Sequence, residues 1–267
     1  MCPYKYFCVL MAIMVIVTGC TNFGADMKAE KMKICKETFL TDNKVSEKAF
    51  LTVGQILEET YIIEVVMYHY GNIYVEYPKI HCLKDKEREK KINSLIENHI
   101  FLEIVKEDDQ GRLNELNMEL ECRITLQSRE LLSFCYVGTV RIDDYSKPFD
   151  EFYSMTVDIK NVKELKLSDF VEIDENLVER IKKSTDISNQ GLEENEDNEV
   201  LRESLLYQVK NIDTDFFIKT RKEGLYGFVL EPEALVVEER VYYAAGRYVL
   251  IRLPGRIIDN HFIFDKS

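Results

Sequence analysis

The sequence predicts an α+β fold with two small subdomains, each an antiparallel sheet that carries one or two packed helices. Three observations lead to this fold class: runs of β-branched and aromatic residues between turn residues, only a few segments with helical periodicity, and no regular alternation of strands and helices. The chain has 267 residues, of which 46% are hydrophobic and 31% are charged, so it can bury a core of its own.

In the first half of the chain the pattern predicts a hairpin, a helix and two further strands. Gly71-Asn72 lies between two runs of β-branched and aromatic residues and is typical of a hairpin turn. The helix follows from an apolar stripe at helical spacing, on which His99 is expected to be a buried core histidine. In order, the expected elements are strands 61–70 and 73–80, a helix within 84–108, and strands 118–127 and 130–142.

After a loop, a new series of strand-like segments begins near residue 150, and we place the boundary between the subdomains there. Asp174 is a favourable N-cap for a helix that continues through Arg180 to Lys183, and LRESLLYQV (201–209) has helical periodicity. The other apolar runs are predicted as strands: YSMTVDI (153–159), LKLSDFV (165–171), FFIK (216–219), YGFVL (226–230), ALVVEERVYY (234–243) and YVLIRLP (248–254).

The first twenty residues predict export and lipidation. Lys5 is the only charged residue before an apolar run over 7–17, which has the length of a signal-peptide core and is short for a membrane span. The run ends in Val17-Thr18-Gly19-Cys20, which resembles the bacterial lipobox. In lipoproteins the signal peptidase recognises the three residues before the cysteine, and the cysteine thiol carries the lipid. The alternatives are an uncleaved anchor or an ordinary secretory signal.

Predicted export and lipidation, together with the boundary near residue 150, divide the chain into four expected parts. They are a lipoprotein signal peptide over 1–19, a lipid anchor and tether over 20–55, an N-terminal α+β domain over 56–150 and a C-terminal α+β domain over 151–260. The mature protein would then be held at the outer face of the bacterial cell membrane by its lipid, which includes acyl chains such as palmitate.

The cysteines that remain beyond the anchor are Cys35, Cys82, Cys122 and Cys135, an even number in a compartment where disulfides form. A two-residue turn at Ser128-Arg129 would place Cys122 directly opposite Cys135, with Cβ atoms about 4.5–5.5 Å apart. Two readings stay open at this point: a Cys122–Cys135 disulfide, or two free and buried thiols.

Composition and motifs limit the chemistry. A net charge of −13 argues against nucleic acid, because phosphate binding needs clustered lysine and arginine. The four histidines lack the spacing of a zinc site, and no nucleophile elbow, P-loop or dinucleotide motif is present, so we expect no catalytic residue, no metal and no cofactor. Acidic residues that could meet a basic partner, or simply be solvated, are Asp143, Asp144, Glu193, Glu194, Glu196, Asp197 and Glu199.

Several segments, in order, resemble a family of extracytoplasmic bacterial proteins. This family pairs a small N-terminal domain of unknown function with a C-terminal domain found in the anti-sigma-V factor RsiV and the peptidoglycan deacetylase PdaC. The matching segments are VEYPKI (75–80), INSLIENHI (92–100), ELLSFCYVGT (130–139), YSMTVDIKNVKELKLSDFV (153–171), DFFIK (215–219) and YAAGRYVLIRLP (243–254).

Two departures from the family bear on the fold. The family has Asn-Gly-Lys in the turn after its central strand, whereas this chain has Asn161-Val162-Lys163, so the turn must tolerate valine or shift. The family's closing strand ends in Pro-Tyr, whereas here Pro254 is followed by Gly255.

The resemblance covers the non-catalytic part of the deacetylase and the ectodomain of the anti-sigma factor, which recognises host lysozyme. It therefore implies a binding or sensing module of the cell envelope, not an enzyme, whose partner is peptidoglycan or a basic wall-active protein such as lysozyme. Together with the lipobox-like residues 17–20, this predicts a lipid-anchored module. The alternative is an envelope hydrolase or cell-wall-modifying enzyme, which a cleft gathering histidine and carboxylates from separate segments would favour. A structural assembly subunit is a third possibility.

Overall fold

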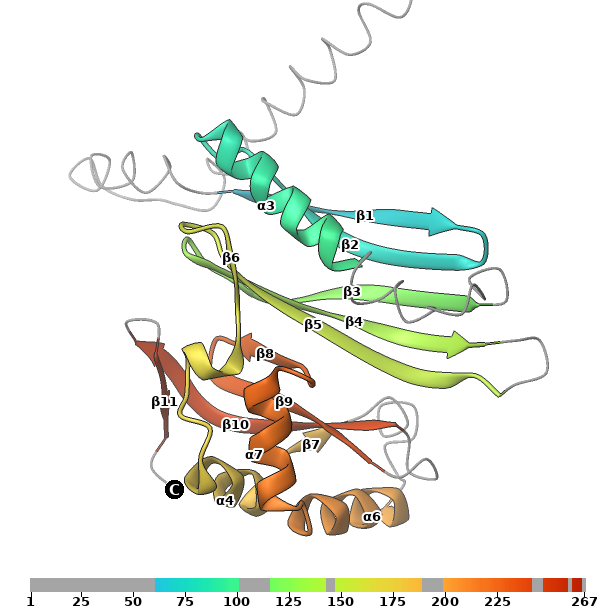
Figure 1. Ribbon diagram of the computed structural model, residues 1–267, viewed down its shortest axis with the longest axis vertical. Coiled ribbons are helices and arrows are strands. Elements are labelled where there is room, and N and C mark those ends of the chain that lie inside the picture. The colour runs from blue at the N-terminus through green and yellow to red at the C-terminus, as the bar shows by residue number, and fades with distance from the viewer. Residues whose placement is uncertain are drawn as a thin grey trace, which may run out of the picture. The chain divides into compact units, whose positions relative to one another are not determined.

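The computed structural model describes residues 61–100, 116–142, 147–188, 199–241, 247–258 and 261–265. The chain divides into two compact units, one of residues 63–81 and 85–267 and one of residues 1–62 and 82–84. In the described residues, the larger unit contains two sheets and four α-helices (Figure 1), which confirms the α+β class.

The first sheet has six strands in sequential order. They are β1 (Ile62–Tyr70), β2 (Ile73–His81), β3 (Asn117–Gln127), β4 (Leu131–Arg141), β5 (Phe149–Asp158) and β6 (Lys163–Leu165). The pairs from β3 to β6 are antiparallel, but β2 and β3 are parallel, because helix α3 (Lys86–His99) lies between them in the chain. The sheet is thus mixed, and it continues beyond the expected boundary at 150. The change from one sheet to the other comes after β6.

Helix α3 lies across the first sheet (Figure 1) and is held by apolar and polar contacts. Asp85 caps its start by accepting the Arg88 N–H at 3.0 Å. The Asn93 amide binds both backbone groups of Ile80 on β2, at 2.8 Å and 2.9 Å, as a paired strand would. His99 is 8% exposed and packs beside Tyr136 of β4, and burial lowers its pKa to about 4. This confirms the expected core histidine, which is neutral at physiological pH.

The β3–β4 hairpin corrects the expected register by one residue. The Ser128 N–H donates to the Leu131 carbonyl at 2.8 Å, so residues 129 and 130 are the central pair of the turn instead of 128 and 129. This turn moves each partner by two positions, and a β-bulge between Ile124 and Leu126 then moves it back by one, so the net change beyond the bulge is one residue.

The shifted register makes the expected cysteine pairing wrong. Cys122 lies opposite Tyr136, and Arg123 lies opposite Cys135. Since neighbouring strand positions point to opposite faces, the two thiols lie on different sides of the sheet. Both are free, Cys135 buried and Cys122 half-buried.

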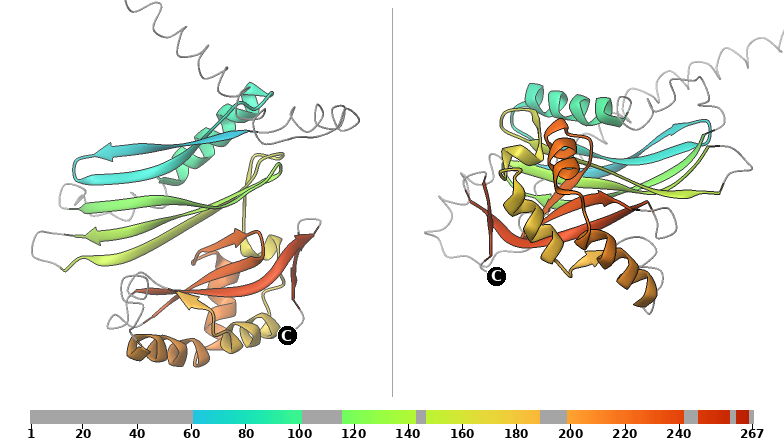
Figure 2. Two further views of the ribbon diagram at one scale, coloured as in Figure 1. Left: turned by 180° about the vertical axis from the view of Figure 1, so that it is seen from behind. Right: turned by 60° about the horizontal axis from the view of Figure 1, so that its bottom comes forward.

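The second sheet is antiparallel in every pairing described, with strand order β8, β9, β10, β11 and β7 also pairing with β10. Its strands are β7 (Ile187–Ser188), β8 (Phe228–Glu231), β9 (Ala234–Arg240), β10 (Tyr248–Ile258) and β11 (His261–Phe264). Helices α4 (Glu175–Lys183), α6 (Glu199–Lys210) and α7 (Thr214–Glu223) pack together on one face of this sheet (Figure 2). No helix in the described part of the chain is long and apolar enough to cross a membrane.

Strand β10 changes partners at Pro254. Its first half pairs with β9 as far as Pro254, and its second half pairs with β11 from Gly255 onward. A Cβ atom on Gly255 would lie 2.4 Å from the Ile263 carbonyl oxygen and 2.5 Å from the Phe262 ring. The absence of a side chain at Gly255 therefore lets β11 approach β10 closely.

Two short apolar runs were assigned wrongly. FFIK (216–219) belongs to helix α7, which is capped by Asp213 at its start and ends at Gly224 in the left-handed conformation. In LKLSDFV, the strand ends at Leu165 and a 3-10 turn follows at 167–169. Runs of about four apolar residues fit a helix face and a strand equally well, so periodicity could not separate them.

The two sheets meet through an apolar cluster and two serine hydroxyls. The Phe228 and Leu230 N–H groups on the outer edge of β8 donate to the Ser154 hydroxyl at 3.0 Å and the Ser133 hydroxyl at 2.9 Å. These serines lie on β5 and β4, so the first sheet satisfies an edge that would otherwise be open. The apolar residues beside them are Cys135, Val137, Phe152, Val229, Val236 and Tyr248.

Val162, in the turn before β6, has an unusual backbone conformation. Val162 has φ 55°, in the left-handed region that β-branched residues disfavour. The preceding Asn161 donates its N–H to the Asp158 carboxylate at 2.8 Å, and its side-chain amide binds the same group. The turn therefore holds valine in a strained conformation.

We expect Val162→Gly to stabilise the protein by about 0.5–1 kcal/mol, because relief of left-handed strain exceeds the added entropy of the unfolded chain. The measurement is the urea unfolding midpoint. Val162→Ala is the matched control: it removes the β-branch but keeps the Cβ atom, so it should bring a smaller gain. Equal effects of the two variants would contradict this explanation.

Candidate functional site

Three hollows surround helix α4. One of about 700 Å³ lies between the start of α4 and α7, one of about 780 Å³ lies between α4 and the β10–β11 corner, and one of about 340 Å³ lies between α4 and β11. Asn176 lines all three, and the residues that line these neighbouring hollows are here named the α4 surface. Its charged residues are Glu172, Asp174, Glu175, Glu179, Arg180, Lys183, Lys222 and Asp265.

The sequence before α4 builds this surface by alternation. Val171 and Ile173 are buried, whereas Glu172 between them is exposed. Asp174 then caps the helix as predicted: its carboxylate accepts the Leu177 N–H at 2.9 Å and the Asn176 amide at 2.8 Å. These hydrogen bonds lower the pKa of Asp174, the backbone one most, so this carboxylate is charged at neutral pH.

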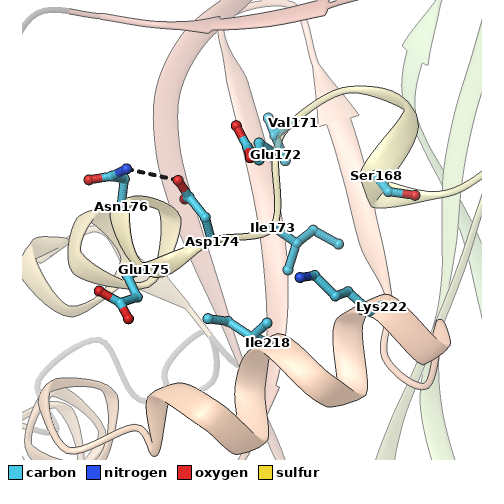
Figure 3. A pocket seen from close by; sticks show the side chains of 9 residues that line it. All are labelled: Ser168, Val171, Glu172, Ile173, Asp174, Glu175, Asn176, Ile218 and Lys222. Atoms are coloured by element: carbon cyan, nitrogen blue, oxygen red, sulfur yellow. Dashed lines mark hydrogen bonds between the residues drawn. The ribbon is translucent and has the colours of Figure 1, made fainter.

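Figure 3 shows the hollow between α4 and α7. Ile218 and Lys222 come from α7 and face Ile173, while Glu172 and Asp174 lie toward the other side of the same segment. Glu175 projects from the first turn of α4. The hollow therefore combines aliphatic walls with carboxylates at its margin and one ammonium group. An aliphatic cation suits such a place, because its stem can pack on the isoleucines while its charge meets the carboxylates.

The hollow between α4 and β11 brings together side chains that are distant in sequence. His261 of β11 lines it together with Glu172 and Asp174, and Arg180 of α4 lies 4.6 Å from the centre of the Phe264 ring. Within the described residues, no group of three histidine, cysteine or acidic side chains is placed to hold a metal ion.

A second charged cluster lies where the two sheets meet. The Glu151 carboxylate on β5 accepts hydrogen bonds from Arg240, at 2.9 Å, and from Arg247. Glu238 on β9 accepts the Gly227 N–H at 2.8 Å and pairs with Arg240 at 2.8 Å. Glu151 is 4% exposed and Glu238 is 2% exposed, so these charges are compensated inside the protein.

A related pair joins α7 to β9. Arg221 is almost fully buried, lies 4.5 Å from the ring centres of both Phe217 and Tyr226, and donates to the Glu239 carboxylate at 2.8 Å and to the Glu238 carbonyl. Burial raises the pKa of Glu239 to about 7 and lowers that of Arg221. The folded pKa of Glu239 is raised, so protonation of this side chain stabilises the folded protein. This stabilisation is fully present below the unfolded pKa of 4.5. That contribution is lost as pH rises through 7.

Sequence reasoning missed both charged clusters, although a signal was present. Glu238, Glu239 and Arg240 interrupt the otherwise apolar run of β9, and Glu151 stands among the aromatic residues of β5. Charges inside a strand of this kind need buried partners, and the partners come from other strands and from α7.

Most of the residues singled out in the sequence lie outside the described residues. These are the lipobox and two acidic groups, namely Val17, Thr18, Gly19, Cys20, Asp143, Asp144, Glu193, Glu194, Glu196 and Asp197. Glu199 is described and opens helix α6, which packs with α4 in one core. The roles proposed for all of them stay predictions.

The fold defines an α+β protein in which two sheets are in contact and the second carries three helices on one face. No protein-family model matches the chain, and no curated protein matches it. Among solved structures, it is similar to a DUF3298 family member from Bacteroides fragilis, with 14% identity and a TM-score of 0.38. A DUF3298 family protein from Pseudomonas aeruginosa has 12% identity and the same TM-score. Each similarity covers 73% of this chain and 89% of the other.

We expect Glu151→Gln to destabilise the protein by about 3–5 kcal/mol, because it leaves two guanidinium groups without their shared counter-charge. Guanidinium chloride unfolding measures the change. The matched control is Glu179→Gln, which removes an exposed carboxylate paired only with Lys183 and should cost less than about 0.5 kcal/mol. A small effect at Glu151 would show that the cluster is solvated in solution.

Proposed function

We propose that the protein is a lipid-anchored binding or sensing module at the outer face of the bacterial cell membrane. Its partner is a cell-wall component or a basic wall-active protein such as lysozyme, and it performs no catalysis. The observation that supports the binding role best is the α4 surface, a concave region with aliphatic walls and an excess of carboxylates.

The anchor is supported by the order of residues at the start of the chain. An apolar run ends in Val17-Thr18-Gly19-Cys20, and a cysteine at this place supplies the thiol that a thioether-linked diacylglycerol requires. Removal of residues 1–19 takes away Lys5 and no other charge, so the net charge of the mature chain changes from −13 to −14.

Charge supports a basic partner. A strongly acidic chain attracts basic proteins over a distance of about 10 Å at ordinary ionic strength, and this attraction raises the rate of association. The α4 surface has five acidic residues and three lysine or arginine residues, so its net charge is negative, like that of the whole chain. Lysine and arginine side chains of the partner would place their stems against Ile173 and Ile218.

The alternative function, an envelope hydrolase, is favoured by one observation. The hollow between α4 and β11 gathers His261 with Glu172 and Asp174 from separate segments, as a hydrolytic site would. Incubation with purified peptidoglycan separates the two functions: release of soluble fragments that His261→Ala abolishes would favour the hydrolase, and binding without release favours the module.

We expect Cys20→Ser to release the protein from membranes, because serine cannot form the thioether to the lipid. The measurement is the distribution of the protein between membrane and soluble fractions of the producing bacterium. Cys122→Ser is the control and should leave the protein with the membrane. Retention of the Cys20→Ser protein in the membrane fraction would refute the lipid anchor.

We expect soluble residues 21–267 to bind lysozyme, with affinity that falls as salt is raised. Glu172→Gln combined with Glu175→Gln should weaken this binding about tenfold at low salt, mainly through slower association. The control combines Glu119→Gln with Glu121→Gln, which removes the same charge from exposed positions on β3 and should change affinity less than about twofold. Equal losses in both double variants would mean that net charge acts without the α4 surface.

A further inference from the structure

A fourth hollow lies where the β3–β4 turn of the first sheet meets the second sheet. Its volume is about 670 Å³, within the range of small-molecule sites, and it shares no lining residue with the α4 surface. Its walls are the end of β3, the β3–β4 turn, the β8–β9 turn and the second half of β10. It is therefore a separate place on the protein, to which the proposed function assigns nothing.

Hydrogen bonds fix the two turns that form this hollow. In the β3–β4 turn, the Ser128 hydroxyl accepts the Leu131 N–H at 2.9 Å. In the β8–β9 turn, the Glu233 carbonyl accepts the Gly255 N–H of β10 at 3.0 Å. The hollow thus has a fixed backbone frame, and a ligand that enters it has little chain ordering to overcome.

Part of the lining is apolar. Leu131 is buried, while Leu126 and Ile257 are partly buried and pack against the main apolar core. Pro232 adds a further apolar surface from the β8–β9 turn. An aliphatic ligand body would cover these side chains and remove their exposed area from water, which favours binding.

The charged part of the lining is basic once its ion pair is counted. The charges belong to Arg129, Glu130, Glu231 and Arg256. Both carboxylate oxygens of Glu231 accept hydrogen bonds from Arg252, one of them at 3.0 Å, so this side chain already has a counter-charge. Two arginines and one glutamate are left, and the sign of the hollow is opposite to that of the α4 surface and of the whole chain.

Arg256 is the group best placed to receive an anion. It stands on β10 opposite Ile263 of β11 and is exposed. Among the described residues, no hydrogen bond or ion pair engages its side chain. A guanidinium presents its N–H groups as a planar fork that matches the two oxygens of a carboxylate.

We propose that this hollow, here named the arginine hollow, binds a small aliphatic monocarboxylate. The carboxylate meets the guanidinium groups of Arg256 and Arg129, and the aliphatic body packs on Leu126, Leu131 and Ile257. One remaining positive charge suits a monoanion better than a phosphate dianion. None of the described side chains that line the hollow is aromatic, so it offers no ring on which a nucleobase would stack. A fatty acid and the C-terminal end of a short aliphatic peptide both have this chemistry.

Isothermal titration calorimetry of the full-length protein tests the proposal. The probes are octanoate, for an acyl chain, and N-acetyl-leucyl-leucine, for a peptide end, with protein-free buffer as the blank. We expect at least one of them to bind. Acetate, which lacks the aliphatic body, and the C-terminal amide of the peptide, which lacks the carboxylate, should each bind at least about tenfold more weakly.

The pattern of binding identifies the source of the ligand. Binding of octanoate alone would support a fatty acid, binding of the peptide alone would support a peptide end, and binding of both would support the shared chemistry. Binding of neither probe would overturn the proposal, and so would acetate or the peptide amide binding as tightly as the probes. Either result would leave lysozyme binding at the α4 surface as it stands, because the two places share no residue.

Substitutions locate the bound probe. Arg256→Gln should weaken binding about tenfold, because it removes a charge-assisted pair of hydrogen bonds. Glu130→Gln should strengthen binding about twofold, since it removes the remaining negative charge, and a damaged fold could not produce such a gain. The control is Lys210→Gln, which removes a positive charge from an exposed position at the end of α6 and should change affinity less than about twofold. Equal effects of Arg256→Gln and Lys210→Gln would overturn the assignment to the arginine hollow.

Discussion

The arrangement of this protein depends on how the edge of β8 is satisfied. An edge strand presents unpaired N–H groups at every second residue, and here Phe228 and Leu230 present theirs to the face of the first sheet. Ser154 and Ser133 accept them there, and Ser133 also bonds the Thr156 hydroxyl at 2.9 Å, which orients it. A sheet edge that would favour aggregation thus becomes the contact that positions the second sheet on the first.

Charged groups beside this contact make it specific. Burying Glu151 with two arginines gains little free energy over an apolar contact of the same size, because desolvation offsets most of the attraction. A misplaced second sheet, however, would leave Glu151 or Glu238 buried without a partner, which costs several kcal/mol. The hydroxyls and the ion pairs therefore exclude alternative packings, while the surrounding apolar cluster supplies most of the stabilisation.

The contact between β8 and the first sheet also determines where the α4 surface lies. Helices α4 and α7 pack on the face of the second sheet that lies away from the apolar seam, so their exposed sides are free to form hollows.

Local patterns in the sequence were sufficient for the fold class, the hairpin at Gly71, the strands β3 to β5 and the capped start of α4 at Asp174, because each depends on residues within a few positions. The assignment of FFIK, the register that separates Cys122 from Cys135 and the partners of Glu151 required the tertiary structure. A four-residue run has no period of its own, a bulge moves every later pair by one position, and a buried charge is satisfied by residues far away in sequence.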